Sequence, residues 1–160
     1  MNRRMKDPVC GMEVDPEENA LVYLEMHFAF CSRQCRERFL ANPHLYVGKP
    51  GHPSPKQEGV VIIKRRRLCL EIPLSPEEAA RLIAALRTMM GIREVSANGD
   101  RVDITYDLLQ ATHEQIETKI SEIGVQLGTG WAERLRRAFV DFEEEILVGS
   151  FGNGGDHCGK

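Results

Sequence analysis

The pattern of apolar and polar positions is clearest in the second half of the chain. Residues 68–72 alternate between apolar and polar side chains, which is the period of a strand buried on one face. Residues 75–78, with the sequence SPEE, supply a serine N-cap, a proline at the first helical position and a glutamate that closes a capping box. A strand and a helix that ends at Gly91 are therefore predicted, and the apolar stripe of the helix consists of Ala79, Leu82, Ile83, Leu86 and Met90.

The pattern continues with a hairpin and a second helix. Residues 92–97 and 102–106 indicate strands on either side of the Asn-Gly pair at 98–99, which is a strong signal for a tight turn. Thr112 and Gln115 form a second capping box. The apolar positions that follow line one face of a helix and then a short last strand: Ile116, Ile120, Ile123, Val125 and Leu127.

The order of these elements over residues 60–128 is βαββαβ. It predicts a ferredoxin-like sandwich, in which four antiparallel strands carry two helices on one face. Cys69 falls in the first strand, on the face opposite the leucines, and is expected to be a free thiol.

A hairpin and a helix are also predicted near the start of the chain. Apolar residues between Leu21 and Phe30 indicate a short hairpin. Ser32 is a suitable N-cap for a helix over residues 33–41, and the Asn-Pro pair at 42–43 ends it. The chain as a whole is therefore predicted to be an α+β protein, with a small N-terminal module ahead of the sandwich.

Proline and glycine mark the boundaries between these parts. Three prolines and three glycines fall within the twelve residues that end at Gly59, which excludes a continuous helix or a central strand there. The predicted organisation is a first unit over residues 1–50, a linker over 51–59, a second unit over 60–128, an amphipathic helix over 129–148 and a flexible glycine-rich tail over 149–160.

The predicted C-terminal helix has an apolar and a charged face. Apolar residues recur at helical spacing between Trp131 and Leu147. We expect this stripe to pack on one of the two units or on a second copy of the chain in a homodimer. The charged face consists of Glu133, Arg136, Arg137 and Glu143 to Glu145.

Composition and charge exclude several classes of protein. The formal net charge is −3 and no segment is strongly basic, so nucleic acid is not an expected partner. No apolar run approaches the 18 residues of a membrane span, and no apolar core follows the basic N-terminus as in a secretory signal. A cytoplasmic protein without membrane insertion is expected. Five cysteines, an odd number, then favour metal binding or free thiols over disulfides.

Three of the cysteines form the pattern C-x20-C-x3-C, at Cys10, Cys31 and Cys35. Cys35 falls in the first turn of the predicted helix, whose N-terminal partial charge favours a thiolate. Cys10 precedes Gly11, which permits a tight turn whose amides can donate to sulfur. Converging thiolates select soft ions, so Cu(I) or Zn(II) is the expected cofactor.

Other donors and another interpretation remain open. Asp7 can complete the coordination of the ion, although an aspartate before proline is typically a turn residue. His27, His44 and the pair His157 and Cys158 in the tail are further candidate ligands. Alternatively, the three cysteines are core residues buried among Phe28, Phe30 and Phe39.

The sequences DPVCGMEV and FCSRQCRERFLANPHLY resemble a YHS domain, one of the treble-clef-like TRASH metal-binding modules, over about residues 6–47. The resemblance implies that Cys10, Cys31 and Cys35 are ligands and that the protein takes part in heavy-metal trafficking, resistance or sensing. Related zinc modules carry another cysteine three residues before the first, where this chain has Asp7. The difference argues against a closed four-cysteine zinc site.

The sequences GIREVSANGDRVDITYD and ISEIGV resemble the heavy-metal-associated domain of copper chaperones and metal ATPases, over about residues 60–128. That family binds metal through a C-x2-C pair between the first strand and the first helix. This chain has residues 73–77, PLSPE, in that loop, so the usual metal site is absent.

These observations predict a metal-binding protein that acts in metal homeostasis as a chaperone, a buffer or an accessory to a metal-transporting ATPase or other metal-handling protein. The alternative is an adaptor or metal sensor with a structural zinc site, whose function depends on protein-protein contacts. No enzyme is expected, because no histidine is placed to activate a cysteine and no phosphate-binding glycine motif occurs.

Overall fold

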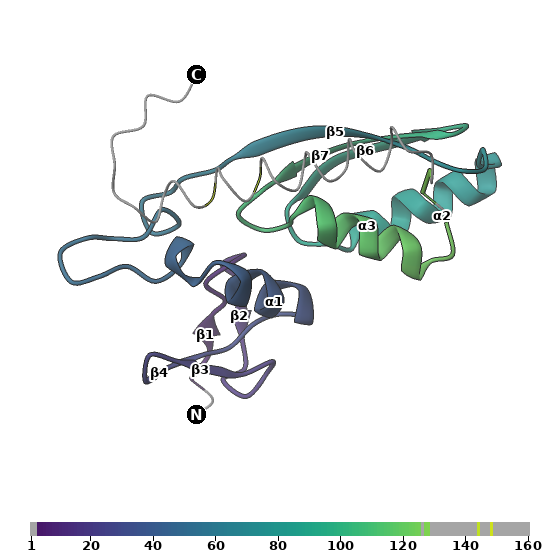
Figure 1. The fold of residues 1–160 in the computed structure, drawn as a ribbon. Helices are drawn as coiled ribbons and strands as arrows, with labels where there is room; N and C mark the ends of the chain where they lie inside the picture. The colour runs from purple at the N-terminus through teal and green to yellow at the C-terminus, as the bar shows by residue number, and fades with distance from the viewer. Residues whose placement is uncertain (1–2, 126, 129–143, 145–147, 149–160) are drawn as a thin grey trace, which may run out of the picture. The chain divides into compact units, whose positions relative to one another are not determined.

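The computed structural model describes residues 3–125, 127–128, 144 and 148, and it has the predicted α+β class (Figure 1). The described residues form two compact units. The first contains the residues up to Val61 together with Val148, and the second runs from Ile62 to Glu144. None of the helices in the described part of the chain has the length and apolarity that a membrane crossing requires.

The first unit contains two small antiparallel ribbons and one α-helix. Strands β1 (Met5–Lys6) and β2 (Glu13–Val14) form one ribbon, and β3 (Leu21–Tyr23) and β4 (Met26–Phe28) form the other. Helix α1 (Arg33–Ala41) follows, and a 3-10 turn η1 (Pro43–Leu45) comes directly after it. The hairpin and the helix over 33–41 therefore lie where the sequence predicts them.

Phe39 of α1 is the centre of the core of this unit. Its side chain is completely buried, as are those of Phe30 and Leu45. Four aromatic rings surround it, with centroid distances of 5.0 to 5.7 Å: Tyr23, Phe28, Phe30 and Tyr46. The hairpin, α1 and the segment after η1 are thus held together by one aromatic cluster.

Residues 51–59, predicted as a linker, belong to the first unit. The Lys56 backbone amide donates to the Leu45 carbonyl over 2.9 Å, and Ser54 is 2% exposed. Gly48 lies so close to this segment that a Cβ atom there would be 2.5 Å from the His52 carbonyl oxygen. The break between the two compact units falls after Val61.

The second unit is a three-stranded antiparallel sheet with two helices on one face (Figure 1). The sheet order is β5 (Ile63–Cys69), β7 (Arg101–Asp107), β6 (Ile92–Asn98). Helices α2 (Pro76–Arg87) and α3 (His113–Glu122) both begin with the predicted capping boxes. The apolar faces of both helices meet the sheet around Val102, Ile104, Leu82, Leu86, Ile116 and Ile120, all of which are almost completely buried.

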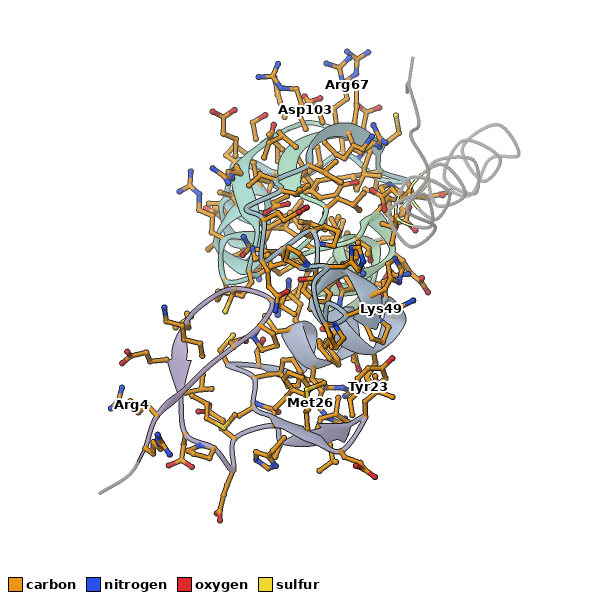
Figure 2. All side chains as sticks on the ribbon, turned by 90° about the vertical axis from the view of Figure 1, so that its left-hand side faces the viewer. Arg4, Tyr23, Met26, Lys49, Arg67 and Asp103 are labelled. Carbon is orange, nitrogen blue, oxygen red and sulfur yellow. The ribbon has the colours of Figure 1, made fainter. Side chains whose placement is uncertain are left out.

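The other face of this sheet is polar. Arg67 on β5 and Asp103 on β7 lie opposite each other, with 2.8 Å between Arg67 Nε and Asp103 Oδ1 (Figure 2). Both side chains are about half exposed, so the pair contributes little to stability. The basic run at residues 64–67 is part of strand β5.

The fourth strand of the predicted sandwich is reduced to a single bridge. Leu127 pairs with Leu70 in antiparallel fashion, and the Gly128 amide donates to the Cys69 carbonyl over 2.9 Å. This contact lies at the edge of the sheet next to β5, where the fourth strand of a βαββαβ fold belongs. The described residues thus retain the predicted order of elements with a shortened last strand.

Four details of the predicted pattern are wrong. The first is the end of α2, which lies at Arg87 and not at Gly91. Ile72 and Ile123 were expected on buried faces but are 65% and 39% exposed, because β5 ends at Cys69 and α3 ends at Glu122. The hairpin loop consists of Gly99 and Asp100, one residue later than expected. Pairing Asn98 with Arg101 keeps Val95, Val102 and Ile104 on the helix-covered face, and this burial determines the register.

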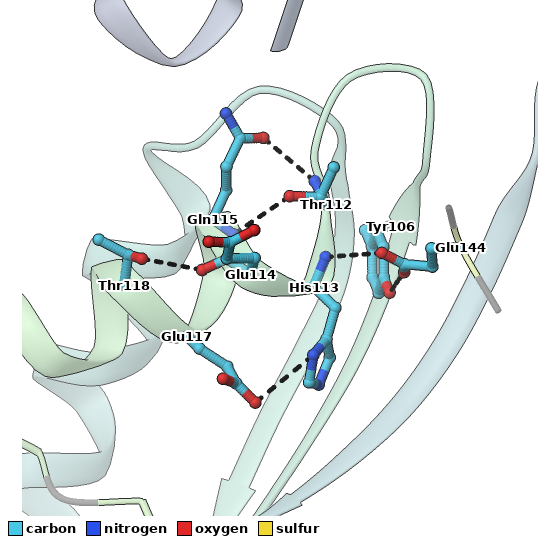
Figure 3. Close-up of polar contacts among 8 residues, drawn as sticks. All are labelled: Tyr106, Thr112, His113, Glu114, Gln115, Glu117, Thr118 and Glu144. Carbon is cyan, nitrogen blue, oxygen red and sulfur yellow. Dashed lines mark hydrogen bonds and ion pairs between the residues drawn. The ribbon is translucent and has the colours of Figure 1, made fainter. Parts of the chain in front are cut away.

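Most of the predicted C-terminal helix lies outside the described residues, but Glu144 differs from its prediction. It was placed on the charged, solvated face, whereas its side chain is 5% exposed. Glu144 accepts a hydrogen bond from the Tyr106 hydroxyl and another, of 3.0 Å, from the backbone amide of His113 (Figure 3). The first amides of a helix have no acceptor within the helix, and this explains why a carboxylate is buried at the start of α3.

Candidate metal centre

Cys10 lies in the turn that joins β1 to β2. Because Lys6 pairs with Glu13, the chain must reverse direction between them. The Asp7 amide donates to the Met12 carbonyl over 2.8 Å, and Gly11 takes a φ of +80°, which glycine adopts without strain. The tight turn predicted beside Cys10 is therefore present.

Cys31 and Cys35 lie at the start of α1. Ser32 caps the helix, and its hydroxyl oxygen accepts a 3.4 Å hydrogen bond from the Cys35 amide. Cys35 is the third residue of the helix, so both sulfurs lie close to the helix N-terminus. The aromatic core packs this end of the helix against the turn that carries Cys10, since Val9 and Phe30 are both completely buried.

The three sulfur atoms converge on one point. Cys31 Sγ lies 3.4 Å from Cys10 Sγ and 3.6 Å from Cys35 Sγ. A tetrahedral ion with bonds of about 2.3 Å to sulfur places its ligands about 3.8 Å apart, so an ion fits between these thiols after small side-chain movements. The separations are much longer than a disulfide bond, and the cysteines are free.

Asp7 lies beside the three sulfurs. One ligand atom from each of Asp7, Cys10, Cys31 and Cys35 can be chosen so that all four lie within 4.8 Å of one another. The donor set of three thiols and one carboxylate can hold a metal ion, and its soft sulfur ligands suit Cu(I) and Zn(II). In the part of the chain that the structure describes, these four residues are the group of His, Cys, Asp or Glu side chains whose ligand atoms lie close enough to share a metal ion.

The thiols perturb one another. The Cys35 thiol donates a hydrogen bond to the Cys10 sulfur and lowers the pKa of Cys10 to about 7, and a hydrogen bond from the Met12 backbone acts in the same direction. The pKa of Cys35 is raised because it is the donor in that bond and because it is buried. Burial raises the pKa of Cys31 to about 12. Without metal, Cys10 is therefore the first of the three to ionise.

The cluster is open on one side. Cys35 is completely buried, whereas Cys10 and Cys31 are partly exposed to solvent. The alternative prediction of cysteines among core aromatics thus describes Cys35, which shares α1 with Phe39. The side of the cluster at Cys10 and Cys31 is therefore partly accessible to solvent.

Two predicted additional ligands lie elsewhere. The exposed His27 ring has Nε2 2.7 Å from the Pro16 carbonyl oxygen, and His44 Nε2 is 3.1 Å from the carbonyl oxygen of Val148. Neither ring belongs to the cluster. His157 and Cys158, proposed as helpers from the tail, lie outside the described residues.

The second unit offers no comparable centre among its described residues. The loop between β5 and α2 is held against the β6-β7 turn, since the Leu74 amide donates to the Gly99 carbonyl over 2.8 Å. It carries no thiol, as the sequence predicts. Cys69 lies at the end of β5, partly exposed, and pairs in the sheet with Arg101.

Sequence reasoning missed the contribution of Ser32 to the centre and understated that of Asp7. The Ser32 hydroxyl lies 3.5 Å from Cys31 Sγ and favours its thiolate, as well as capping α1. Asp7 was recognised as a turn residue, but its carboxylate also bonds to the distant Cys31 amide. The N-cap serine directly after Cys31 was a signal in the sequence that could have indicated the Ser32 contact. No local pattern indicates the contact between Asp7 and Cys31, which are 24 residues apart.

Comparison with known families supports part of this description. The family model described as the YHS domain matches residues 5–49. The match covers less than a third of the chain and includes all four residues of the cluster. No curated protein and no solved structure matches the chain. No match supports the heavy-metal-associated resemblance expected after the first unit, so that assignment stays a prediction.

Proposed function

We propose that the first unit binds a soft heavy-metal ion, Cu(I) or Zn(II), as cargo, and that the protein acts in metal trafficking or resistance in the cytoplasm. The observation that carries this proposal is a set of three converging sulfurs, of which Cys10 and Cys31 face solvent. A structural site is expected to be closed on all sides, whereas an open position permits ligand exchange.

The proposed mechanism is stepwise thiolate exchange. A soft ligand from a partner joins the ion on the open side, and one of the exposed sulfurs then leaves. Cys10 and Cys31 are the candidate leaving ligands, because both are partly exposed and an incoming ligand can approach them. Cys35, buried in the core, is expected to hold the ion until last. The partner is a metal-transporting ATPase or another metal-handling protein, and no catalytic step is required.

The second unit is proposed to supply contacts to that partner. The family that it resembles binds metal in a loop that contains no thiol in this chain. The second unit keeps the order of elements of that family without the metal-binding pair.

In the full chain, replacing Cys10, Cys31 and Cys35 together with serine should abolish tight binding of Cu(I) and Zn(II). Stoichiometric binding tighter than micromolar in that triple variant would contradict a metal-free second unit.

Metal analysis of protein purified without oxygen tests the main proposal. We expect about one equivalent of copper or zinc in the wild type after supplementation with that metal, and a large loss in Cys31→Ser. Cys69→Ser is the matched control, because it removes a partly exposed cysteine outside the cluster. Equal metal content in all three proteins would contradict the proposal.

A structural zinc site in an adaptor or sensor is the second candidate, favoured by the complete burial of Cys35 next to the aromatic core. Removing the metal separates the two functions. A structural site should unfold the first unit when the metal is chelated, whereas a transfer site should release the metal and keep the fold. Amide hydrogen exchange in α1 reports this unit, because the helix carries the completely buried Phe39.

A further inference from the structure

The carboxylate of Asp7 bonds to both segments that carry the cysteines. Its side chain is 1% exposed. Oδ1 accepts hydrogen bonds from the Val9 amide over 2.7 Å and from the Cys10 amide over 3.3 Å, whereas Oδ2 accepts one from the Cys31 amide over 2.8 Å. One ionised group thereby joins the β1-β2 turn to the start of α1.

We propose that Asp7 positions the cysteines and is not itself a metal ligand. The centre therefore offers three sulfur ligands, a number that suits Cu(I), which three soft donors can fully coordinate. This inference rests on the proposed function, since it names the ion that the proposed cargo site prefers. The positioning role of Asp7 does not require the ion, because its hydrogen bonds to the two cysteine segments are already formed in the metal-free protein.

Hydrogen-bonding capacity supports the assignment. A carboxylate has about four lone-pair positions, and the three amides occupy three of them. Oδ1 is saturated, and the carboxylate also accepts a hydrogen bond from the Cys31 thiol, which raises the pKa of that cysteine. A bond to a metal would draw electron density from the oxygen that holds Cys31 in place, and a shift of the carboxylate toward the ion would leave buried amides without an acceptor, which is costly.

The geometry of the sulfurs agrees with this role. The 3.4 Å and 3.6 Å separations already approach those of a shared ion without any contribution from the carboxylate. Bonds from amides to an ionised acceptor are stronger than neutral ones, so Asp7 preorganises the two cysteine segments. Four-coordinate zinc would have to recruit solvent or another ligand, whereas three-coordinate Cu(I) needs nothing more.

X-ray absorption of the Cu(I)-loaded full-length protein tests the ligand set. We expect three sulfur neighbours and no oxygen or nitrogen neighbour in the wild type. An oxygen neighbour that is present in the wild type and absent from Asp7→Asn would overturn the proposal, because it would identify the carboxylate as a ligand.

Cu(I) affinity, measured by competition with a chromophoric chelator, tests the positioning role. Asp7→Asn keeps the shape of the side chain but loses one acceptor oxygen and the charge, and we expect affinity to fall about 10- to 100-fold, as for other residues that orient metal ligands. Asp15→Asn is the matched control, since Asp15 is exposed and its carboxylate accepts a bond from the Glu17 amide, away from the cluster. An unchanged affinity in Asp7→Asn would contradict the proposal.

Amide hydrogen exchange in the metal-free protein separates this inference from the proposed function. Exchange at Val9, Cys10 and Cys31 should accelerate in Asp7→Asn and stay unchanged in Asp15→Asn. A wild type that binds neither Cu(I) nor Zn(II) would refute the proposed function, and exchange would still decide whether Asp7 joins the two segments. If Asp7→Asn fails to fold, Asp7→Glu, which keeps the charge and displaces the oxygens, gives the same comparison.

Discussion

At the scale of single residues, the chemistry of the centre depends on the position of each thiol. Cys10, Cys31 and Cys35 have the same side chain, yet burial and mutual hydrogen bonding direct their pKa values apart. Without metal, the unequal thiols therefore have a first site of deprotonation, at Cys10. Spacing in the sequence predicts that the sulfurs converge, but it does not predict this difference.

Alkylation kinetics of the metal-free protein should reveal the difference between the thiols. Because the pKa of Cys10 is lowered to about 7, its reaction with iodoacetamide should reach half its maximum rate near pH 7, below the range of an ordinary cysteine. Cys31 should react only at higher pH, and buried Cys35 most slowly. Peptide mass spectrometry gives the three rates, with Cys69 as an internal reference. A common midpoint for Cys10 and Cys31 would contradict this prediction.

Phe39 is the single residue on which the core of the first unit depends most. Phe39→Ala removes a completely buried ring that contacts four others, so the free energy of unfolding of this unit should fall by about 3–5 kcal/mol. Urea denaturation followed by hydrogen exchange of the α1 amides measures the loss in this unit. Leu40→Ala, next in the helix but 44% exposed, is the control and should change stability by less than about 1 kcal/mol.

At the scale of elements, local signals predicted helix starts better than helix ends, since α2 ends at Arg87 and not at Gly91. Both capping boxes in the second unit form as expected, at Ser75 with Glu78 and at Thr112 with Gln115. These signals succeed because each cap is satisfied within its own turn. Strand ends were predicted less well, as the exposure of Ile72 indicates, because a strand ends where its partner ends.

The N-cap of α2 allows a test at this scale. In Ser75→Ala the amide of Glu78 loses its acceptor, and the free energy of unfolding should fall by about 1 kcal/mol. Thermal unfolding followed by circular dichroism measures the change. Ser121→Ala, at an exposed position near the end of α3, is the matched control and should leave stability almost unchanged. Equal effects in both variants would show that the cap is not the cause.

At the scale of the whole molecule, contacts between distant residues decide what each segment does. Glu144 comes from a part of the sequence that predicts a solvated charged face, yet its carboxylate is buried against Tyr106 and the start of α3. Near the other end of the chain, Asp7 bonds to an amide 24 residues away. Both carboxylates satisfy backbone amides that would otherwise be buried without acceptors.

A double-mutant cycle between Glu144 and Tyr106 tests the first of these contacts. Glu144→Gln and Tyr106→Phe should each destabilise the protein by about 1–3 kcal/mol, because each leaves a buried polar partner unsatisfied. The coupling energy should be about 0.5–3 kcal/mol in chemical denaturation. Glu114→Gln, an exposed glutamate in the first turn of α3, is the control. Strictly additive effects would contradict a direct interaction.

Periodicity, helix caps and thiol spacing are local properties, and they were enough to predict the class, the order of the elements and the three-cysteine pattern. Tertiary packing sets three further facts: Cys35 is buried while Cys10 and Cys31 are partly exposed, His27 lies away from the centre, and Asp7 accepts hydrogen bonds from both cysteine segments. These facts depend on how the β1-β2 turn packs against α1, and such packing joins residues that no local pattern connects.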